Sequence, residues 1–289
     1  MQAFLRELTY RNMKKQSLLL ALLVLLAATA AQAQPLCFLT YNIRYDNPAD
    51  GADAWPLRRD FLVAQLRFHA PDVFGIQEGL QRQVEYIETQ LPAYARVGVG
   101  RDDGREAGEY SALFYRKERF KALDSGTFWL SETPDSVSKG WDAALPRICT
   151  WALLEESASG RKFWVFNTHF DHVGALAREN SAKLILQKIK TFNSANYPVA
   201  LLGDLNSEPG SAPVALLQNA LSDTHDHCQE PPFGPEGTFN GFRFQEPVTR
   251  RIDYIFVSGA WKTRKYAVLS DSRNCHYPSD HLPVLVRVE

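Results

Sequence analysis

The chain has 289 residues, of which 45% are hydrophobic and 12% aromatic, and its 32 basic and 33 acidic side chains nearly cancel. This composition is ordinary for a globular protein. The near-neutral charge argues against a protein that coats long nucleic acids electrostatically, although it does not exclude an enzyme that meets phosphate through a bound cation.

The N-terminus has the features of a secretory signal peptide. Met13-Lys14-Lys15 gives a basic start, residues 18–28 are apolar, and Ala31-Gln32-Ala33 is a small-residue cleavage site. The apolar run is shorter than the ~20 residues that cross a bilayer, which favours cleavage over a membrane anchor. We therefore expect translation to start at Met13 and residues 1–33 to be removed. The product is then a secreted or periplasmic chain, 34–289, with no stable membrane insertion.

The mature chain is long enough for one large domain. Without the four basic side chains and one acidic side chain of residues 1–33, 28 basic and 32 acidic side chains remain. All four cysteines are retained, and none forms a C-x-x-C motif, which argues against a thiol redox motif or a cysteine zinc site. Export permits disulfides, and the three full pairings stay open beside the alternative that Cys37 and Cys149 are small buried strand residues.

Short apolar runs alternate with longer amphipathic stretches along the chain. In chain order, the short runs predict strands at 36–43, 73–77, 111–115, 149–154, 163–168, 199–202, 251–257 and 282–288. Amphipathic stretches predict helices at 58–69, 81–91, 175–192 and 213–218, and residues 131–146 and 229–245 are Gly/Pro-rich loops. Because several strands follow one another without helices, the order favours antiparallel pairing and two packed sheets with helices outside.

Polar side chains interrupt six of these apolar segments near a strand end. They are Asn42, Glu78, His169, the Asp204/Asn206 pair, Asp253 and the Asp280/His281 pair. Burying a charge costs several kcal/mol unless it is paired or bound to a metal, so one such residue is easily structural but six together are not. Carboxylate and amide oxygens suit Mg²⁺, Mn²⁺ or Ca²⁺, and the two histidines suit acid–base chemistry.

The segments TYNI, GIQEG, NTHFDH, GDLNSEP, RIDYIFV and SDHLPV occur in that order across essentially the whole mature chain. As a set they resemble the endonuclease/exonuclease/phosphatase superfamily, which includes pancreatic-type deoxyribonuclease, abasic-site endonucleases, inositol polyphosphate 5-phosphatases, neutral sphingomyelinases and nocturnin-type enzymes. The resemblance implies a four-layer α/β sandwich, in which two packed mixed or antiparallel sheets are flanked by helices. It also implies a metal-dependent phosphoric ester hydrolase.

Residue by residue, the resemblance implies metal binding by Glu78, Asn42 and Asp280, with Mg²⁺ as the expected ion and Mn²⁺ or Ca²⁺ as alternatives. Asp204 would orient or deprotonate the attacking water, and Asn206 would hold a phosphate oxygen. The cation and a protonated imidazole would neutralise the charge that builds on the phosphate.

Two imidazole–carboxylate pairs complete the implied machinery. His281 matches the catalytic histidine, with Asp253 orienting it, and His169 matches a second histidine of the deoxyribonuclease branch, with Glu109 as a looser match to its partner. A buried carboxylate beside an imidazole raises the pKa of the imidazole, so the pairs would supply acid and base. Which histidine plays which part stays open.

Four further residues are candidates for substrate contact. Asp171 and His172 follow His169, Arg147 precedes a strand and could grip a phosphate, and Tyr110 follows Glu109. A surface ion pair for Arg147 and a structural loop for Asp171 and His172 remain open.

The leading interpretation is a phosphodiesterase of nuclease type that acts on a nucleic acid, a nucleotide or a small phosphodiester, as a monomer. The nearest alternative keeps the chemistry but acts on a phosphate monoester of a sugar, inositol or lipid headgroup. A third is a catalytically inactive binding module on the same fold. The motifs do not separate diester from monoester.

Overall fold

The computed structural model describes residues 1, 13–14, 34–259 and 261–289. Pro35–Glu289 form one compact unit. The predicted signal peptide lies almost wholly outside the described residues, so its cleavage and the start at Met13 stay predictions. In the part of the chain that the structure describes, none of the helices combines the length and the hydropathy that a bilayer crossing demands.

The first sheet has six strands in the order β11-β12-β1-β2-β4-β3. Their bounds are β1 Leu36–Asn42, β2 Val73–Gln77, β3 Tyr94–Val97, β4 Leu113–Arg116, β11 Thr263–Val268 and β12 Val284–Val288. The β1–β2 pair is parallel, while β1–β12 and β2–β4 are antiparallel, so the sheet is mixed.

The second sheet also has six strands, in the order β5-β6-β7-β8-β10-β9. Their bounds are β5 Phe120–Trp129, β6 Ile148–Glu156, β7 Lys162–His169, β8 Val199–Asp204, β9 Ser222–Asp223 and β10 Asp253–Val257. Here β7–β8 is the parallel pair, and β8–β10 is antiparallel. The sequence did not predict β3, β5, β9 or β11.

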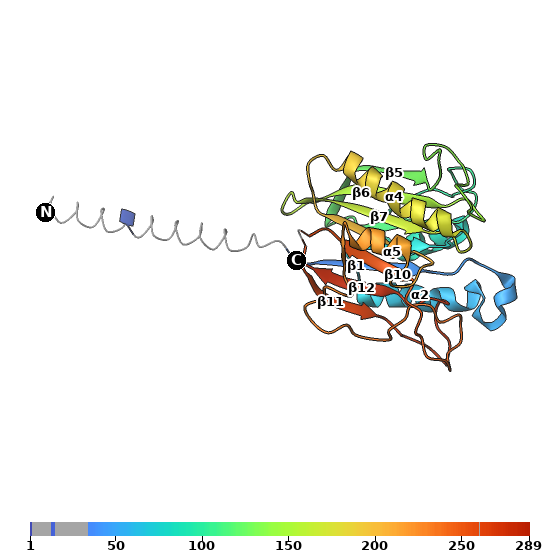
Figure 1. The fold of residues 1–289 in the computed structure, drawn as a ribbon. Coiled ribbons are helices and arrows are strands. Elements are labelled where there is room, and N and C mark those ends of the chain that lie inside the picture. The colour runs from blue at the N-terminus through green and yellow to red at the C-terminus, as the bar shows by residue number, and fades with distance from the viewer. Residues whose placement is uncertain (2–12, 15–33, 260) are drawn as a thin grey trace. The chain divides into compact units, whose positions relative to one another are not determined.

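Helices cover the outer faces of both sheets. They are α2 Trp55–His69, α3 Gln81–Gln90, α4 Ala175–Phe192 and α5 Ala212–Gln218, with a 3₁₀ helix η1 at Pro48–Asp53. Figure 1 shows α4 lying over the strands β6 and β7 and α5 nearer β10, with α2 beside the other sheet. Every helix that the sequence predicted is present, and the Gly/Pro-rich stretches 131–146 and 229–245 are loops.

Three buried apolar clusters define the layers. One lies between the sheets and joins residues such as Phe38 of β1 to Phe163 of β7. A second packs α2 and α3 onto the first sheet, for example through Leu62 and Val84, and a third packs α4 onto the second sheet through Ile185. The order helix, sheet, sheet, helix is the predicted four-layer α/β sandwich, which is confirmed.

The four cysteines are unpaired thiols in this structure. Cys149 is buried on β6 and Cys37 is partly buried on β1. Burial raises the pKa of both thiols above its usual range, which disfavours the reactive thiolate.

Candidate active site

The register of the sheets brings the predicted strand-end residues to one rim. Asn42 at the end of β1 pairs with Gln77, the residue before Glu78. In the second sheet, Asp204 at the end of β8 pairs with His169 on one side and with Asp253 on the other. Residues far apart in the sequence therefore become neighbours because their strands end, or begin, at the same edge.

Asp253 orients the imidazole of His281. The His281 Nδ1 atom lies 2.8 Å from Asp253 Oδ2, and both residues are buried. The Phe239 ring packs against the imidazole, with 5.1 Å between ring centroids. Burial alone would lower the pKa of His281, but the negative charges of Asp253 and Asp204 outweigh burial and raise it. A protonated imidazole that can donate from Nε2 follows from this arrangement.

Asn42 links the two sides of the rim. Its Nδ2 atom donates to Glu78 Oε1 at 3.0 Å and to Asp204 Oδ2 at 2.9 Å, and its Oδ1 accepts from the Arg44 N–H at 3.0 Å. Glu78 accepts a further hydrogen bond from the Tyr45 N–H at 3.1 Å. The fully buried amide thus fixes the distance between two carboxylates.

The carboxylates at this rim fit a divalent cation. Glu78 and Asp280 border the same cavity, and burial, together with the charge of Glu78, raises the pKa of Asp280 to about 6 despite the opposing effect of His281. Asp204, Asp253 and His281 also bring ligand-type atoms within 4.8 Å of one another. A hard cation with oxygen ligands would neutralise this excess of buried negative charge. Because the His281 imidazole is hydrogen-bonded to Asp253, the carboxylates of Glu78 and Asp280 suit the ion better than the group of Asp204, Asp253 and His281 does.

Three residues at the rim have a left-handed backbone although none is glycine. Arg44, Glu78 and Asn206 have φ angles of 54°, 64° and 45°. Such conformations cost on the order of 1–3 kcal/mol each and persist where the surroundings fix them. Asn206 illustrates this, because its N–H donates to Asp204 Oδ1 at 2.8 Å. These left-handed residues turn the chain just beyond the ends of β1, β2 and β8.

The second imidazole has a different partner from the one expected. Arg147 Nη1 lies 3.1 Å from His169 Nδ1, whereas Glu109 Oε2 lies 4.0 Å from the same atom. Glu109 is instead held by Arg101, with contacts of 2.7 and 3.0 Å. Burial and the charges of Arg147 and Arg101 lower the pKa of His169 well below its usual range. The expected rise in the pKa of His169 beside Glu109 does not occur, and the structure favours a neutral imidazole.

The Nε2 atom of His169 faces the rim. It lies 3.0 Å from Asn206 Nδ2 and 3.5 Å from Asp204 Oδ2. Asn206 also donates to the Phe170 carbonyl at 3.0 Å. His169 and Asn206 are therefore positioned together.

The Arg147 guanidinium is held by contacts inside the protein and is not free to bind a phosphate. Its Nε and Nη2 atoms contact Asp171 Oδ2 at 3.3 Å and His172 Nδ1 at 2.9 Å, in addition to the contact with His169. Its side chain is only 5% exposed. With all three nitrogens engaged, Arg147 orients two histidines while still bordering the cavity.

Two of the four predicted substrate contacts lie away from the cavity. Asp171 is 1% exposed and accepts from the backbone N–H groups of Ala144, Leu145, Val173 and Gly174. Burial opposes ionisation, but these donors lower the pKa of Asp171. Tyr110 is 2% exposed, and its hydroxyl is bonded to Gln81 and to the Arg105 carbonyl. Both side chains are structural here because their polar atoms are already satisfied within the protein.

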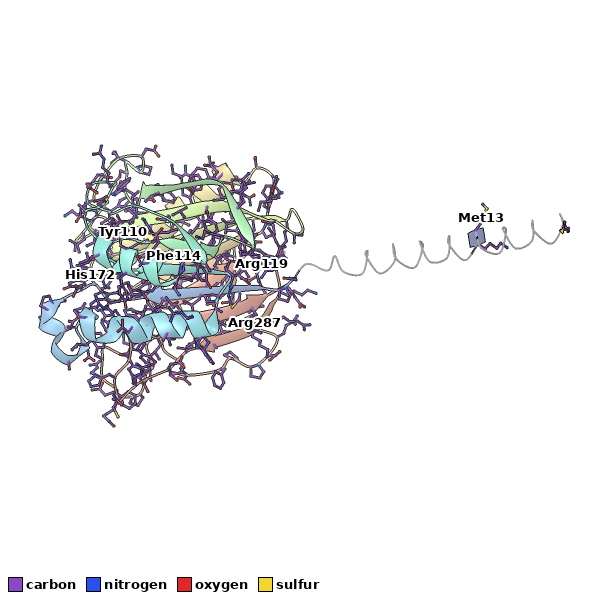
Figure 2. All side chains as sticks on the ribbon, turned by 180° about the vertical axis from the view of Figure 1, so that it is seen from behind. Met13, Tyr110, Phe114, Arg119, His172 and Arg287 are labelled. Carbon is purple, nitrogen blue, oxygen red and sulfur yellow. The ribbon has the colours of Figure 1, made fainter. Side chains whose placement is uncertain are left out.

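His172 does border the cavity and is half exposed. Figure 2 shows it at the end of the domain away from Arg119 and Arg287. Its Nδ1 accepts from Arg147, so its Nε2 is the nitrogen left for a ligand.

The rim surrounds a cavity of about 460 Å³. The predicted residues that border it are Glu78, Glu109, Arg147, His169, His172, Asp204, Asn206, Asp280 and His281. Sequence reasoning missed six others that do so: Arg44, Tyr45, Leu145, Phe239, Arg250 and Ile252. Arg44 and Arg250 sit two or three residues from Asn42 and Asp253, and that proximity to a motif was the available signal.

Comparison with solved structures places this geometry in a known group. An endonuclease/exonuclease/phosphatase family protein from Bacteroides thetaiotaomicron is 38% identical, with a TM-score of 0.85, over 89% of this chain and 98% of that one. A mannosyl-6-phosphatase from the same organism is 39% identical, with a TM-score of 0.83, over 88% of this chain and 99% of that one.

Curated sequences are more distant. An uncharacterised mimivirus protein is 27% identical over 81% of this chain and 92% of its own length. The Ccr4 exoribonuclease subunit of Saccharomyces cerevisiae is 22% identical over 82% of this chain, which spans only 35% of that protein. The model of the Endonuclease/Exonuclease/phosphatase family matches residues 39–281. The chain therefore belongs to the endonuclease/exonuclease/phosphatase family, whose members are metal-dependent phosphoesterases.

Proposed function

We propose that this chain is an exported, Mg²⁺-dependent phosphatase that hydrolyses a small phosphate monoester, with a phosphorylated sugar as the favoured substrate. The observation that carries the proposal is the convergence of Glu78, Asp204, Asp280 and the Asp253–His281 pair on one cavity. Export rests on the signal-peptide features of residues 1–33.

Glu78 and Asp280 would hold the ion, with Asn42 positioning Glu78 from beneath. Mn²⁺ or Ca²⁺ could replace Mg²⁺ with the same oxygen ligands. When bound, the ion neutralises charge on the phosphate oxygens and so reduces the repulsion between the ester and an incoming nucleophile.

The chain's own residues carry the protons. Burial and the nearby charge of Asp253 raise the pKa of Asp204, which makes its carboxylate basic enough to accept a proton from the attacking water. The water oxygen bonds to phosphorus as its proton passes to Asp204, and the bond from phosphorus to the ester oxygen breaks. The released alkoxide takes a proton from solvent water to leave as an alcohol, and Asp204 returns its proton to solvent. His281, protonated beside Asp253, donates a hydrogen bond from Nε2 to a phosphate oxygen. His169 and Asn206 border the same cavity, and Asp204 lies between His169 and Asp253 in the sheet.

Two features favour a monoester of a sugar. The mannosyl-6-phosphatase is 39% identical and is covered over 99% of its length, whereas the exoribonuclease relatives are more distant and longer. The chain also has no excess of basic over acidic side chains. A long nucleic acid would need such an excess for binding, whereas a small sugar phosphate would not.

A phosphodiester of nucleic-acid type, the leading interpretation of the sequence, is the second candidate. The similarity to Ccr4 exoribonuclease subunits supports it. The catalytic groups described above would serve either ester, because both need a neutralised phosphate and an activated water.

Phosphate release from mannose 6-phosphate, compared with cleavage of bis-p-nitrophenyl phosphate, tests the proposal. We expect Mg²⁺-dependent turnover of the monoester that exceeds turnover of the diester, and loss of activity in EDTA that Mg²⁺ restores. A faster diester reaction would instead support the second candidate. Absence of metal-dependent turnover of any phosphate ester would contradict both and favour a binding module.

A further inference from the structure

A second cavity lies beside the catalytic one. It has a volume of about 510 Å³ and shares Asn206, Arg250 and Ile252 with the catalytic cavity. Its other walls come from the N-terminal turns of α4 and α5 and from the segment between β8 and α5. A ligand whose phosphate lies among the catalytic groups can therefore extend past Asn206 into this space.

The charges around the second cavity are balanced. The lining contains two arginines, Arg178 and Arg250, and two glutamates, Glu179 and Glu208, so it carries no net charge at neutral pH. Arg178 is partly engaged, because its Nη1 donates to the Asp171 carbonyl at 3.0 Å. A groove for a nucleic-acid backbone would need an excess of positive charge to bind the phosphates. The ligand that suits this lining is polar but uncharged.

The remaining walls mix small apolar groups with hydroxyls. Leu176 is 51% exposed, and Ala175 and Ala212 are also exposed at the lining. Ser207 lines the cavity with a buried hydroxyl that has no hydrogen-bond partner within the described residues. None of the described side chains around this cavity is aromatic, so it offers no surface for base stacking. The Ser211 hydroxyl already donates to the Glu208 carbonyl at 2.6 Å, so the polar groups left for a ligand are mainly the charged side chains of the lining. Such polar groups beside short apolar patches match the polar edge and the C–H face of a sugar ring.

The two cavities meet at an exposed ion pair. Arg250 Nε lies 3.2 Å from Glu208 Oε1, and both side chains are more than half exposed. An exposed pair contributes only ~0–1 kcal/mol, so a ligand hydroxyl can exchange with either partner at little cost. The Arg250 guanidinium also lies over the Phe239 ring at 5.2 Å, which holds it at the junction.

We propose that the second cavity binds a neutral sugar unit next to the phosphorylated one, so that the enzyme acts on phosphorylated glycans in preference to free sugar phosphates. The inference rests on the proposed phosphatase function and names its substrate class. Contacts with the additional sugar, made away from the reacting phosphate, would raise kcat/KM.

The test compares mannose 6-phosphate with the same 6-phosphomannosyl group joined through its anomeric oxygen to a second mannose. We expect kcat/KM to be about tenfold higher for the disaccharide, which corresponds to about 1.4 kcal/mol of additional binding energy in the transition state. In Ala212→Trp, which fills the cavity from an exposed position, the ratio of the two kcat/KM values should fall to near one. Leu176→Ser, which removes the apolar patch without adding bulk, should lower the ratio too.

The matched control is Ala220→Trp, which adds the same bulk at an exposed alanine outside the cavity lining and should keep the wild-type ratio. Equal kcat/KM values for the two wild-type substrates would overturn the glycan inference while leaving the phosphatase proposal intact. A tenfold gain for a thymidine dinucleotide 5′-phosphate, and none for the disaccharide, would assign the cavity to nucleic acid and overturn it as well. Failure to hydrolyse either sugar phosphate would contradict both proposals.

Discussion

At the scale of single residues, polar side chains near strand ends were the sequence signal for most of the residues that gather at the candidate site. Asn42, Glu78, Asp204 and His281 could be located because each is a polar residue that interrupts an apolar run. The direction of a side chain on a loop follows from no such rule, so the adjacent Asp171 and His172 were predicted alike, although one is buried and the other borders the cavity.

The missed site residues had weaker signals. Arg44 and Arg250 lie on loops where charged residues are common, and their place at the cavity depends on how the chain turns after β1 and before β10. The sequence could not identify the side chain that contacts His169 Nδ1 either, because a choice between Glu109 and Arg147 requires interatomic distances.

The contacts of Arg147 give a prediction at this scale. In Arg147→Met, the buried Asp171 loses its ion pair, and His169 and His172 lose a hydrogen-bond donor. Removing one partner of a buried pair costs about 3–5 kcal/mol, and the backbone donors that still hold Asp171 put the expected loss at the low end. Urea unfolding measures the loss. Arg243→Met, which breaks an exposed pair with Glu246, should cost less than about 1 kcal/mol. Equal losses of unfolding free energy in the two variants would refute the role of Arg147 in holding Asp171 and the two histidines.

At the scale of elements, the four strands that the sequence did not predict are the four edge strands. β11 and β3 end the first sheet, and β5 and β9 end the second. Edge strands are partly solvent-exposed and carry polar residues, so they lack the apolar runs that identify central strands. β5 shows this directly, because most of its residues are exposed or half-buried and its pairing with β6 shifts register once.

The two sheets are joined by a polar contact near the rim as well as by apolar packing. The buried Asn167 amide donates to the carbonyls of Ile76 and Ala112 at 2.9 Å each and accepts from Gln77 Nε2 at 2.6 Å. A Cβ atom on Gly75 would lie 2.5 Å from Asn167 Cγ, so the close approach requires glycine. This contact fixes β2 against β7 and thereby sets Glu78 relative to His169.

We therefore expect Gly75→Ala to destabilise the protein by roughly 1–3 kcal/mol, because the added methyl group displaces an amide that has no free space to move into. The natural comparison is Gly259→Ala, where an added Cβ would have nothing within 4 Å and the backbone needs no left-handed conformation. That variant should change stability by less than about 1 kcal/mol. Thermal unfolding of the two variants decides the matter, and a Gly75→Ala protein as stable as wild type would disprove the contact.

At the scale of the whole molecule, the fold explains why one cavity collects the chemistry. The two sheets face each other across an apolar cluster, and the parallel pairs β1–β2 and β7–β8 point their carboxyl ends to the same rim. The class of fold followed from the order of strands and helices in the sequence. The second cavity did not, because it forms where the ends of α4 and α5 meet the segment after β8.

The proposed function depends on acidic side chains at this rim that hold a divalent ion for phosphate ester hydrolysis. The most direct measurement is the Mg²⁺ dependence of mannose 6-phosphate hydrolysis by wild type, by Glu78→Gln and by Glu230→Gln, an exposed glutamate paired with Lys265 as control. We expect that Glu78→Gln needs more Mg²⁺ and loses about a hundredfold or more in kcat/KM, with an unchanged circular dichroism spectrum, while Glu230→Gln behaves as wild type. A Glu78→Gln enzyme with wild-type activity at the same Mg²⁺ concentration would contradict the metal-binding role of Glu78.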